Sequence, residues 1–176
     1  RSTQSRSSAA SDVYKRQVGD KEVKLFEVGP AHTNGDVIVF VPDDKVVFTG
    51  DILFIEGHPI LWAGPVSNWI DACNRIISLD IENVVPGHGP VTDKKGVEAV
   101  RDYLIYIHHE AKIRFDGGME ALEACKDIDL KAFSSWGDGE RIAVNINSLY
   151  REFRGEEQRE DITLLFTQMA ELAKDN

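Results

Sequence analysis

Residues 37–41 read VIVFV, and this unbroken apolar run limits the folds open to the chain more than any other segment does. The run is short, has turn-forming residues on both sides, and consists of β-branched and aromatic side chains, which favours a strand. Because successive side chains of a strand point to opposite faces, a run without a polar member predicts a strand covered on both faces. A second apolar segment, residues 46–48, follows after a turn, so residues 37–48 are expected to form a β-hairpin.

The remaining apolar pattern alternates between strand and helix at first and becomes helical toward the end. Short apolar segments that stop at Gly or Pro predict strands, and apolar residues spaced three and four apart predict amphipathic helices. The expected strands span residues 21–28, 37–41, 46–48 and 83–85, and the expected helices span residues 68–79, 94–115, 119–125, 141–153 and 161–173. Ser67 and Asp93 are suitable N-caps for the first two helices, and residues 50–66 are expected to be a long loop. The pattern predicts a mixed α+β fold.

The first 17 residues differ in composition from the rest of the chain. They are rich in serine and contain only two sizeable apolar side chains, Val13 and Tyr14. Such a segment buries too little surface to offset its ordering entropy, so residues 1–17 are expected to be a disordered tail that looks foreign to the domain. The rest is expected to divide into a domain over residues 18–115 and a helical C-terminal extension over residues 116–176.

Charge and hydropathy exclude two classes of partner. The 176-residue chain has a formal net charge of −10. An acidic chain without a basic stripe is not expected to bind nucleic acid or an anionic membrane surface. No apolar segment approaches the roughly 18 residues that a membrane span needs. The two cysteines, Cys73 and Cys125, are too few for a disulfide framework and are expected to be small buried apolar residues.

Three side chains of the kinds that bind metals each follow an expected strand by way of a glycine. They are His32 in GPAHTNGD, Asp51 in VFTGDILF and His88 in VVPGHGPV. If these strands belong to one sheet, the three side chains can meet at one edge of it. Imidazole nitrogen and carboxylate oxygen are ligands that zinc accepts, and a carboxylate can bridge two cations. Taken singly, each residue has a simpler interpretation, because a loop histidine is commonly solvated and an aspartate in a turn commonly bonds a local backbone N–H.

The stretch GPAHTNGDVIVFVPDDKVVFTGDILF, followed by VVPGHGP, resembles the C-terminal half of the metallo-β-lactamase superfamily. The resemblance implies an αββα sandwich hydrolase with one or two metals at the sheet edge. It implies that His32 completes the shell of the first metal, that Asp51 bridges, and that His88 belongs to the second metal. Two Zn²⁺ ions are then expected in the intact site, with iron or manganese as alternatives. Metal-activated water would attack an ester, thioester, lactam or similar bond of a small-molecule substrate.

The sequence departs from that family in one respect that matters for activity. The family's HxHxDH motif, which supplies most ligands of the first metal and the aspartate that handles the water, does not occur in the sequence. The catalytic residues are therefore unassigned, and the chain is interpreted as an N-terminally truncated piece that is inactive by itself. Two other hypotheses stay open: a catalytically dead metallo-β-lactamase-like binding module, and a plain α/β fold in which the three residues are structural. The compartment, cytoplasmic or periplasmic, is open as well.

His58 lies seven residues after Asp51, in the segment FIEGHPILWAG. This loop is expected to bring His58 near the mouth of the site, where it either contacts substrate or is simply exposed. The helices after residue 115 are expected either to pack over one side of the site or to form a contact in a homo-oligomer. Without the other half of the sandwich, the strand at residues 37–41 is expected to lose cover on one face, which predicts low stability and aggregation.

Overall fold

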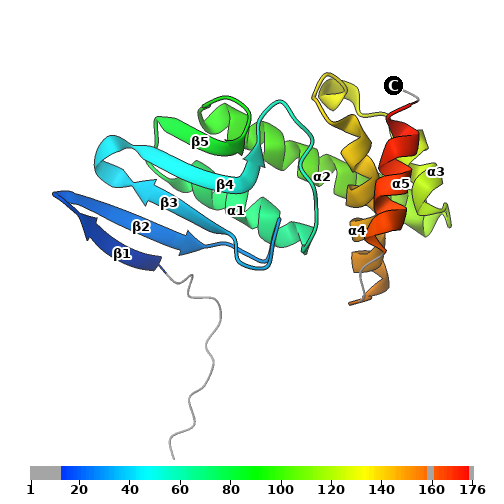
Figure 1. Ribbon diagram of the computed structural model, residues 1–176, viewed down its shortest axis with the longest axis horizontal. Coiled ribbons are helices and arrows are strands. Elements are labelled where there is room, and N and C mark those ends of the chain that lie inside the picture. The colour runs from blue at the N-terminus through cyan, green and yellow to red at the C-terminus, as the bar shows by residue number, and fades with distance from the viewer. Residues whose placement is uncertain (1–12, 158–160, 175–176) are drawn as a thin grey trace, which may run out of the picture.

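The computed structural model describes residues 13–157 and 161–174. Within them, one five-stranded sheet is combined with helices, which confirms the mixed α+β fold class (Figure 1). The strands are β1 (Val13–Val18), β2 (Lys21–Glu27), β3 (Val37–Val41), β4 (Val46–Phe54) and β5 (Asn83–His88). The α-helices are α1 (Val66–Ser78), α2 (Lys94–Asp116), α3 (Ala121–Asp127), α4 (Ile142–Arg154) and α5 (Ile162–Leu172). The 3₁₀ helices are η1 (Pro42–Asp44), η2 (Lys131–Phe133) and η3 (Gly139–Arg141).

The strands follow one another across the sheet in the order of the chain. Strands β1 to β4 form antiparallel pairs, whereas β4 and β5 run parallel and are connected through α1. A parallel pair needs such a crossover because both of its strands start at the same edge. For the same reason β4 and β5 also end at one edge of the sheet, and side chains near these two ends are brought close together.

Helices α1 and α2 pack together against one face of the sheet (Figure 1). They contribute Trp69, Ile76 and Leu104, which are completely buried, as are Ile38 and Val47 of the sheet. The buried apolar residues form one continuous cluster that extends from β2 to α5. This burial is the main source of stability for a chain of this kind.

Strand β3 is covered on one face only: the apolar run by itself predicted cover on both faces, whereas loss of cover on one face was expected for a chain without the other half of the sandwich. Ile38 and Phe40 are buried on the helix side, whereas Val37 is 43% exposed and Val39 and Val41 are partly exposed. The physical reason is that α1 and α2 lie on the same face, and no helix of the described ranges covers the other face (Figure 1). An apolar row crosses this open face in register, one residue per strand: Tyr14, Leu25, Val39, Phe48 and Val85.

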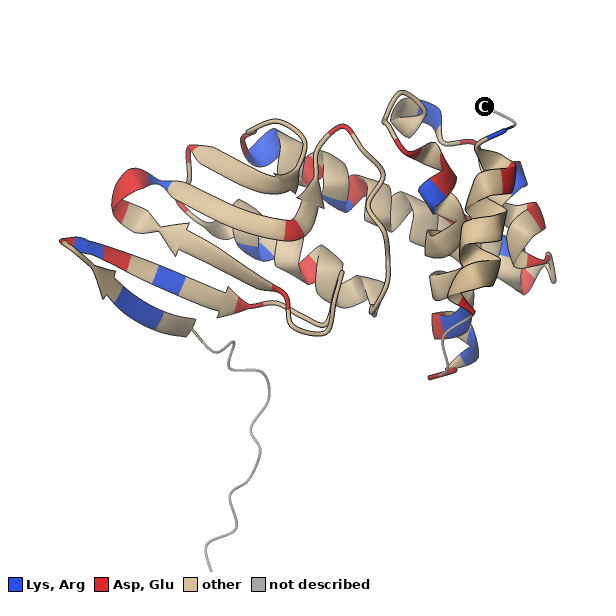
Figure 2. Cartoon of the chain, in the orientation of Figure 1, with Lys and Arg blue, Asp and Glu red and all other residues tan. Residues whose placement is uncertain are grey.

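Residues 13–17, which the composition assigned to a disordered tail, belong to strand β1. The strand pairs with β2 from Val13 opposite Phe26 to Val18 opposite Lys21, and all six of its side chains are exposed. Figure 2 shows its basic residues at the edge of the sheet. Because the pairing rests on backbone hydrogen bonds, it needs no buried side chains, and composition therefore gives no signal for it. The other residues of the expected tail, 1–12, lie outside the described residues.

The other predicted elements are present with shifted ends. Strand β4 continues past Phe48 to Phe54, so the first part of the expected long loop is strand. Helix α2 begins after Asp93, whose side chain accepts a hydrogen bond from the Lys95 N–H at 2.8 Å, as a cap should. Helix α1 instead has Pro65 as its N-cap, and Ser67 lies within the helix.

Helix α2 connects the sheet to the C-terminal helices. It contacts α3 and α4, and α5 packs on α4 (Figure 1). The expected boundary at residue 115 falls at the end of α2, and buried side chains on both sides of it share the single core cluster. None of the described helices is both long and apolar enough to cross a membrane.

Candidate functional site

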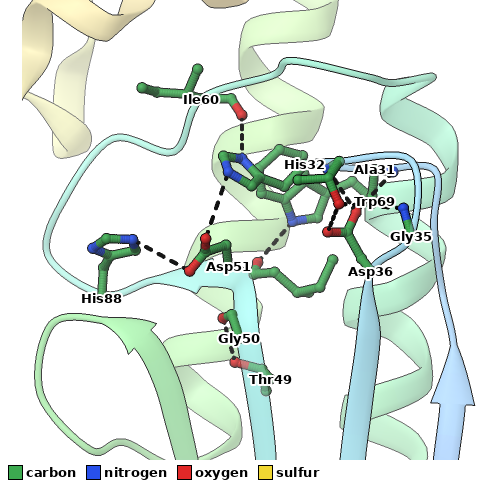
Figure 3. Close-up of polar contacts among 12 residues, drawn as sticks. Ala31, His32, Gly35, Asp36, Thr49, Gly50, Asp51, Ile60, Trp69 and His88 are labelled. Atoms are coloured by element: carbon green, nitrogen blue, oxygen red, sulfur yellow. Dashed lines mark hydrogen bonds and ion pairs between the residues drawn. The ribbon is translucent and has the colours of Figure 1, made fainter.

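The structure brings His32, Asp51 and His88 together at the edge where β4 and β5 end (Figure 3). Asp51 belongs to β4, His88 is the last residue of β5, and His32 lies in the loop between β2 and β3. Asp51 Oδ2 is 3.7 Å from His32 Nε2, and Asp51 Oδ1 is 3.3 Å from His88 Nε2. The two histidines therefore face different oxygens of the same carboxylate.

Irregular pairing between β4 and β5 places the Asp51 carboxylate beside His88. The register shifts on both sides of Gly50, which has a positive φ of 52°. Gly87 of β5 passes so close to β4 that a Cβ at this position would clash with Asp51 Oδ1 and lie 2.7 Å from the Gly50 carbonyl oxygen. Only glycine permits so close an approach, so position 87 sets where the carboxylate can stand.

Asp36 shapes the turn that presents His32. Its Oδ2 accepts hydrogen bonds from the Ala31 and Thr33 N–H groups at 3.1 and 2.9 Å, and its Oδ1 accepts one from the Thr33 hydroxyl at 2.7 Å. The residues on both sides of His32 are thus tied to one carboxylate (Figure 3). Asp36 is a site residue that was not among those predicted from the sequence. The signal that could have found it is an aspartate directly after the Asn34-Gly35 turn, where a carboxylate commonly accepts from nearby N–H groups.

The second ring nitrogen of His32 fixes the orientation of the ring. His32 Nδ1 lies 2.8 Å from the carbonyl oxygen of Ile60. A carbonyl can only accept, so Nδ1 carries the proton and Nε2 of the neutral ring keeps a lone pair directed at Asp51. The ring also packs against Phe54 and Trp69, with centroids 5.5 and 5.7 Å away. The Ile60 carbonyl and the Phe54 and Trp69 rings therefore fix the His32 ring without the help of a ligand.

Solvent reaches the site from the side of His88 and Asp51. Their side chains are 54% and 46% exposed, whereas the His32 side chain is 11% exposed. The His88 ring stacks on Phe54, with centroids 4.3 Å apart and an interplanar angle of 10°. Phe54 therefore contacts both histidines and forms the apolar wall of a site that is open on the other side.

His58 does not stand at the mouth of the site, which corrects the expectation of an exposed or substrate-contacting histidine. It is completely buried, with Nδ1 2.9 Å from the Tyr103 hydroxyl and Nε2 3.1 Å from the Phe133 carbonyl oxygen. The physical reason is that residues near Phe133 and Trp136 fold back over this loop, and both rings pack near His58 and Tyr103. Burial lowers the pKa of His58 from its usual 6.5, partly offset by the hydrogen bond to the Phe133 carbonyl.

The two cysteines are outside the site. Cys73 and Cys125 are buried and free, as the sequence predicted. Burial raises the pKa of each thiol to about 12, so neither is a thiolate at neutral pH. His108 and His109 lie on α2, where the His108 ring packs against Phe153.

The three site side chains meet in pairs and do not converge on one point. No group of three or more His, Cys, Asp or Glu side chains within residues 13–157 and 161–174 is arranged so that it could hold a metal ion. Figure 3 shows why: Asp51 lies between the two histidines, and each histidine meets its own carboxylate oxygen. The structure thus brings the predicted residues together, and their role as metal ligands stays a prediction.

Comparison with known proteins relates the sheet and the site to one family. Residues 10–88 match the model of the metallo-beta-lactamase superfamily, and this range contains all five strands and His32, Asp51 and His88. The Beta-lactamase-like protein 2 homolog of Caenorhabditis elegans is 29% identical over 93 residues, which are 53% of this chain and 30% of that protein. The hydroxyacylglutathione hydrolase of Brucella ovis is 36% identical over 58 residues, which are 33% of this chain and 22% of that protein. The chain spans less than a third of the length of these curated relatives.

A solved structure extends the likeness of fold beyond the family match. The stereoselective inverting sec-alkylsulfatase Pisa1 from Pseudomonas sp. superposes with a TM-score of 0.62 at 12% identity, over 81% of this chain and 26% of that one. At this identity the likeness concerns the fold alone. Because the superposed share exceeds the matched residues 10–88, it includes part of the C-terminal helices.

Proposed function

The chain belongs to the metallo-β-lactamase superfamily of hydrolases, and on that basis we propose that His32, Asp51 and His88 hold a zinc-type divalent metal for a hydrolytic reaction. One observation carries the proposal: the two oxygens of a single carboxylate each face the Nε2 atom of a histidine (Figure 3). In His32 this atom is the lone-pair side of the ring, because Nδ1 donates to the Ile60 carbonyl. A lone pair facing a carboxylate leaves two acceptors opposite each other, which is an arrangement suited to a cation.

The donor set and its spacing support a zinc-type ion. Zinc binds imidazole nitrogen and carboxylate oxygen at about 2.0–2.2 Å, so two donors that share a tetrahedral ion lie about 3.3–3.6 Å apart. The Asp51–His88 contact of 3.3 Å falls in this range, and the Asp51–His32 contact of 3.7 Å is slightly longer. The use of different oxygens supports the proposal that Asp51 would bridge two ions. This supports two Zn²⁺ ions in the intact site, with iron or manganese as alternatives.

Two zinc ions need more ligands than three residues supply. The HxHxDH motif that supplies them in the family is absent from the sequence. We therefore expect the chain by itself to bind metal weakly and to be inactive as a hydrolase, whereas the whole protein's activity is proposed to need these three residues together with further ligands.

When bound, such a metal lowers the pKa of a water molecule toward about 7 and so supplies a nucleophile at neutral pH. His32, Asp51 and His88 would hold and orient the metal and would not transfer a proton through Nε2 or the carboxylate, because these atoms would be occupied as ligands. The half-exposed side chains of Asp51 and His88 leave an open side for a small-molecule substrate. The bond to be cleaved is proposed to be an ester, thioester, lactam or similar bond, since the fold itself does not name one.

Metal binding by the full chain tests the proposal. The metal-free protein is titrated with Co²⁺, whose absorption spectrum reports the type and geometry of the ligands, and then with Zn²⁺ in competition. We expect saturable binding that is weakened about 10-fold or more in His32→Ala, Asp51→Ala and His88→Ala. His109→Ala, which removes an exposed histidine of α2, is the matched control and should bind like the wild type. Absence of binding by the folded wild type, or unchanged binding in the three site variants, would overturn the proposal.

A second candidate function is that of a binding module without catalysis. A folded wild-type chain that binds neither Co²⁺ nor Zn²⁺ would support this second function instead of the first. In both cases the partner is proposed to be a small molecule rather than nucleic acid or a membrane. Assembly into a homo-oligomer through the C-terminal helices is a further proposal, which sedimentation velocity would test.

A further inference from the structure

Three side chains of α4 bond the backbone of the loop that connects β4 to α1. Asn145, Ser148 and Glu152 are spaced three and four residues apart, so they share one face of the helix. Asn145 accepts from the Leu61 N–H at 2.9 Å and donates to the Pro59 carbonyl at 2.9 Å. The Ser148 hydroxyl donates to the Leu61 carbonyl at 2.6 Å, and Glu152 accepts from the first N–H of α1 at 3.1 Å. One helix face therefore sets the path of this loop.

A single peptide unit of the loop connects Asn145 to His32. The carbonyl of Ile60 accepts from His32 Nδ1 at 2.8 Å, and the N–H of Leu61 donates to Asn145 Oδ1 at 2.9 Å. This carbonyl and this N–H belong to the same planar peptide, so the direction of one fixes the direction of the other. The same peptide also becomes a stronger acceptor when its N–H is bonded, because hydrogen bonds in a chain polarise one another.

The Asn145 amide is itself unable to turn. It is completely buried, and its remaining N–H donates to the Tyr103 hydroxyl at 3.0 Å. That hydroxyl lies 2.9 Å from His58 Nδ1, and His58 Nε2 donates to the Phe133 carbonyl. Because Nε2 of His58 must be the donor, Nδ1 of the neutral ring accepts from Tyr103, and every donor in the chain has its acceptor. Rotating the amide would break three hydrogen bonds in a buried environment.

We propose that Asn145, assisted by Ser148, is a positioning residue for the candidate metal site: it holds the Ile60–Leu61 peptide so that His32 keeps Nδ1 protonated and Nε2 directed at Asp51. The inference rests on the proposed function, because orienting His32 matters for the chemistry only if His32 is a metal ligand. It gives the C-terminal helices a role in the chemistry of the site, because Asn145 acts on His32, which lies more than a hundred residues earlier in the chain. Second-layer hydrogen bonds of this kind fix the tautomer and direction of a ligating histidine.

The first test uses the metal-free full chain and so does not depend on metal binding. The ¹⁵N chemical shifts of the His32 ring, measured by NMR at mildly alkaline pH, report which nitrogen carries the proton. In the wild type we expect the Nδ1–H form alone, with a slowly exchanging proton. In Asn145→Ala we expect a mixture with the Nε2–H form and exchange of the Nδ1 proton that is about 10-fold faster.

The matched control is Asn147→Ala on the same helix. Asn147 is also buried, but it donates to the Gln168 side chain at 2.7 Å and to the Ala143 carbonyl at 2.8 Å and not to the loop. It should keep the wild-type ring shifts. Wild-type shifts in Asn145→Ala, or the same change in both variants, would overturn the proposal. If Asn145→Ala does not fold, Ser148→Ala decides: faster exchange at His32 supports the proposal, and wild-type exchange overturns it.

The second test separates this proposal from the proposed function. Titration with Co²⁺ should show about 10-fold weaker binding for Asn145→Ala than for Asn147→Ala. A wild type that does not bind Co²⁺ would overturn the metal site while the ring-nitrogen result still stands on its own. A wild type that binds, together with unchanged affinity and an unchanged spectrum in Asn145→Ala, would overturn the positioning role alone.

Discussion

Glycine at position 87 leaves the space in which the Asp51 carboxylate lies between the two histidines. A Cβ at position 87 would clash with Asp51 Oδ1 and with the backbone of Gly50. Gly87→Ala should therefore lower the free energy of unfolding by about 1–3 kcal/mol, the usual cost of forcing an extra carbon into a packed place. It should also weaken Co²⁺ binding, because the carboxylate must move. Urea denaturation and metal titration measure the two effects. Gly139→Ala is the control, since a Cβ there meets open space; equal behaviour of the two variants would contradict the prediction.

His58 predicts part of the pH dependence of stability. Because burial lowers its pKa in the folded state below the usual 6.5, the unfolded state binds a proton first as the pH falls. The free energy of unfolding should thus decrease as the pH drops from about 6.5 toward the folded-state pKa, while above about 6.5 both states are neutral and His58 adds no slope. Asp138 and Glu140 oppose the shift and Arg141 reinforces it. In His58→Gln this part of the slope should vanish, whereas His109→Gln should retain it. Parallel stability–pH curves for the wild type and His58→Gln would show the prediction to be wrong.

At the level of elements, the sequence predicted best what depends on local pattern. The apolar spacing of α1, α2 and α4 and the cap at Asp93 arise within a few residues, so the helices were found with small errors at their ends. Strand β1 was missed because its pairing uses backbone atoms and leaves every side chain exposed. The extension of β4 was missed because Gly50 suggested a turn, whereas the strand continues through an irregular register to Phe54.

In the candidate site too, the residues that follow a local pattern were predicted, and those that depend on distant contacts were not. His32, Asp51 and His88 could be named from the sequence because each follows an apolar segment by way of a glycine, and the parallel pair of β4 and β5 brings Asp51 and His88 to one edge. Asp36 is an exception, because its contacts are local, and its signal is an aspartate that directly follows the Asn34-Gly35 turn. Asn145 acts through contacts with a loop 84 residues earlier, which no local pattern displays. The position of His58 was predicted wrongly for the same reason: its burial is produced by a segment around Phe133, 75 residues later in the chain.

Both faces of the sheet carry apolar side chains, but the described helices cover only one of the two faces. The open face holds the row formed by Tyr14, Leu25, Val39, Phe48 and Val85, of which Tyr14 is 50% and Phe48 44% exposed. A contiguous apolar surface of this kind promotes association between molecules. The net charge of −10 opposes association only at long range, and salt screens it within about 10 Å.

Self-association through this face is therefore the expected behaviour of the isolated chain. Phe48 is a central-strand member of the row with a half-exposed ring, so Phe48→Lys should lower the concentration-dependent association measured by sedimentation velocity. No loss of thermal stability is expected, because the ring is already partly in water. Ile105→Lys is the matched control: Ile105 is similarly exposed, at 47%, but lies on α2, away from the open face. An equal effect of the two substitutions would mean that added charge, not the face, controls association. A wild-type chain that remains monomeric at every concentration and melts cooperatively would mean that this face is stable in water as it stands, because the partly exposed valines and aromatic rings are too dispersed to pair with another molecule.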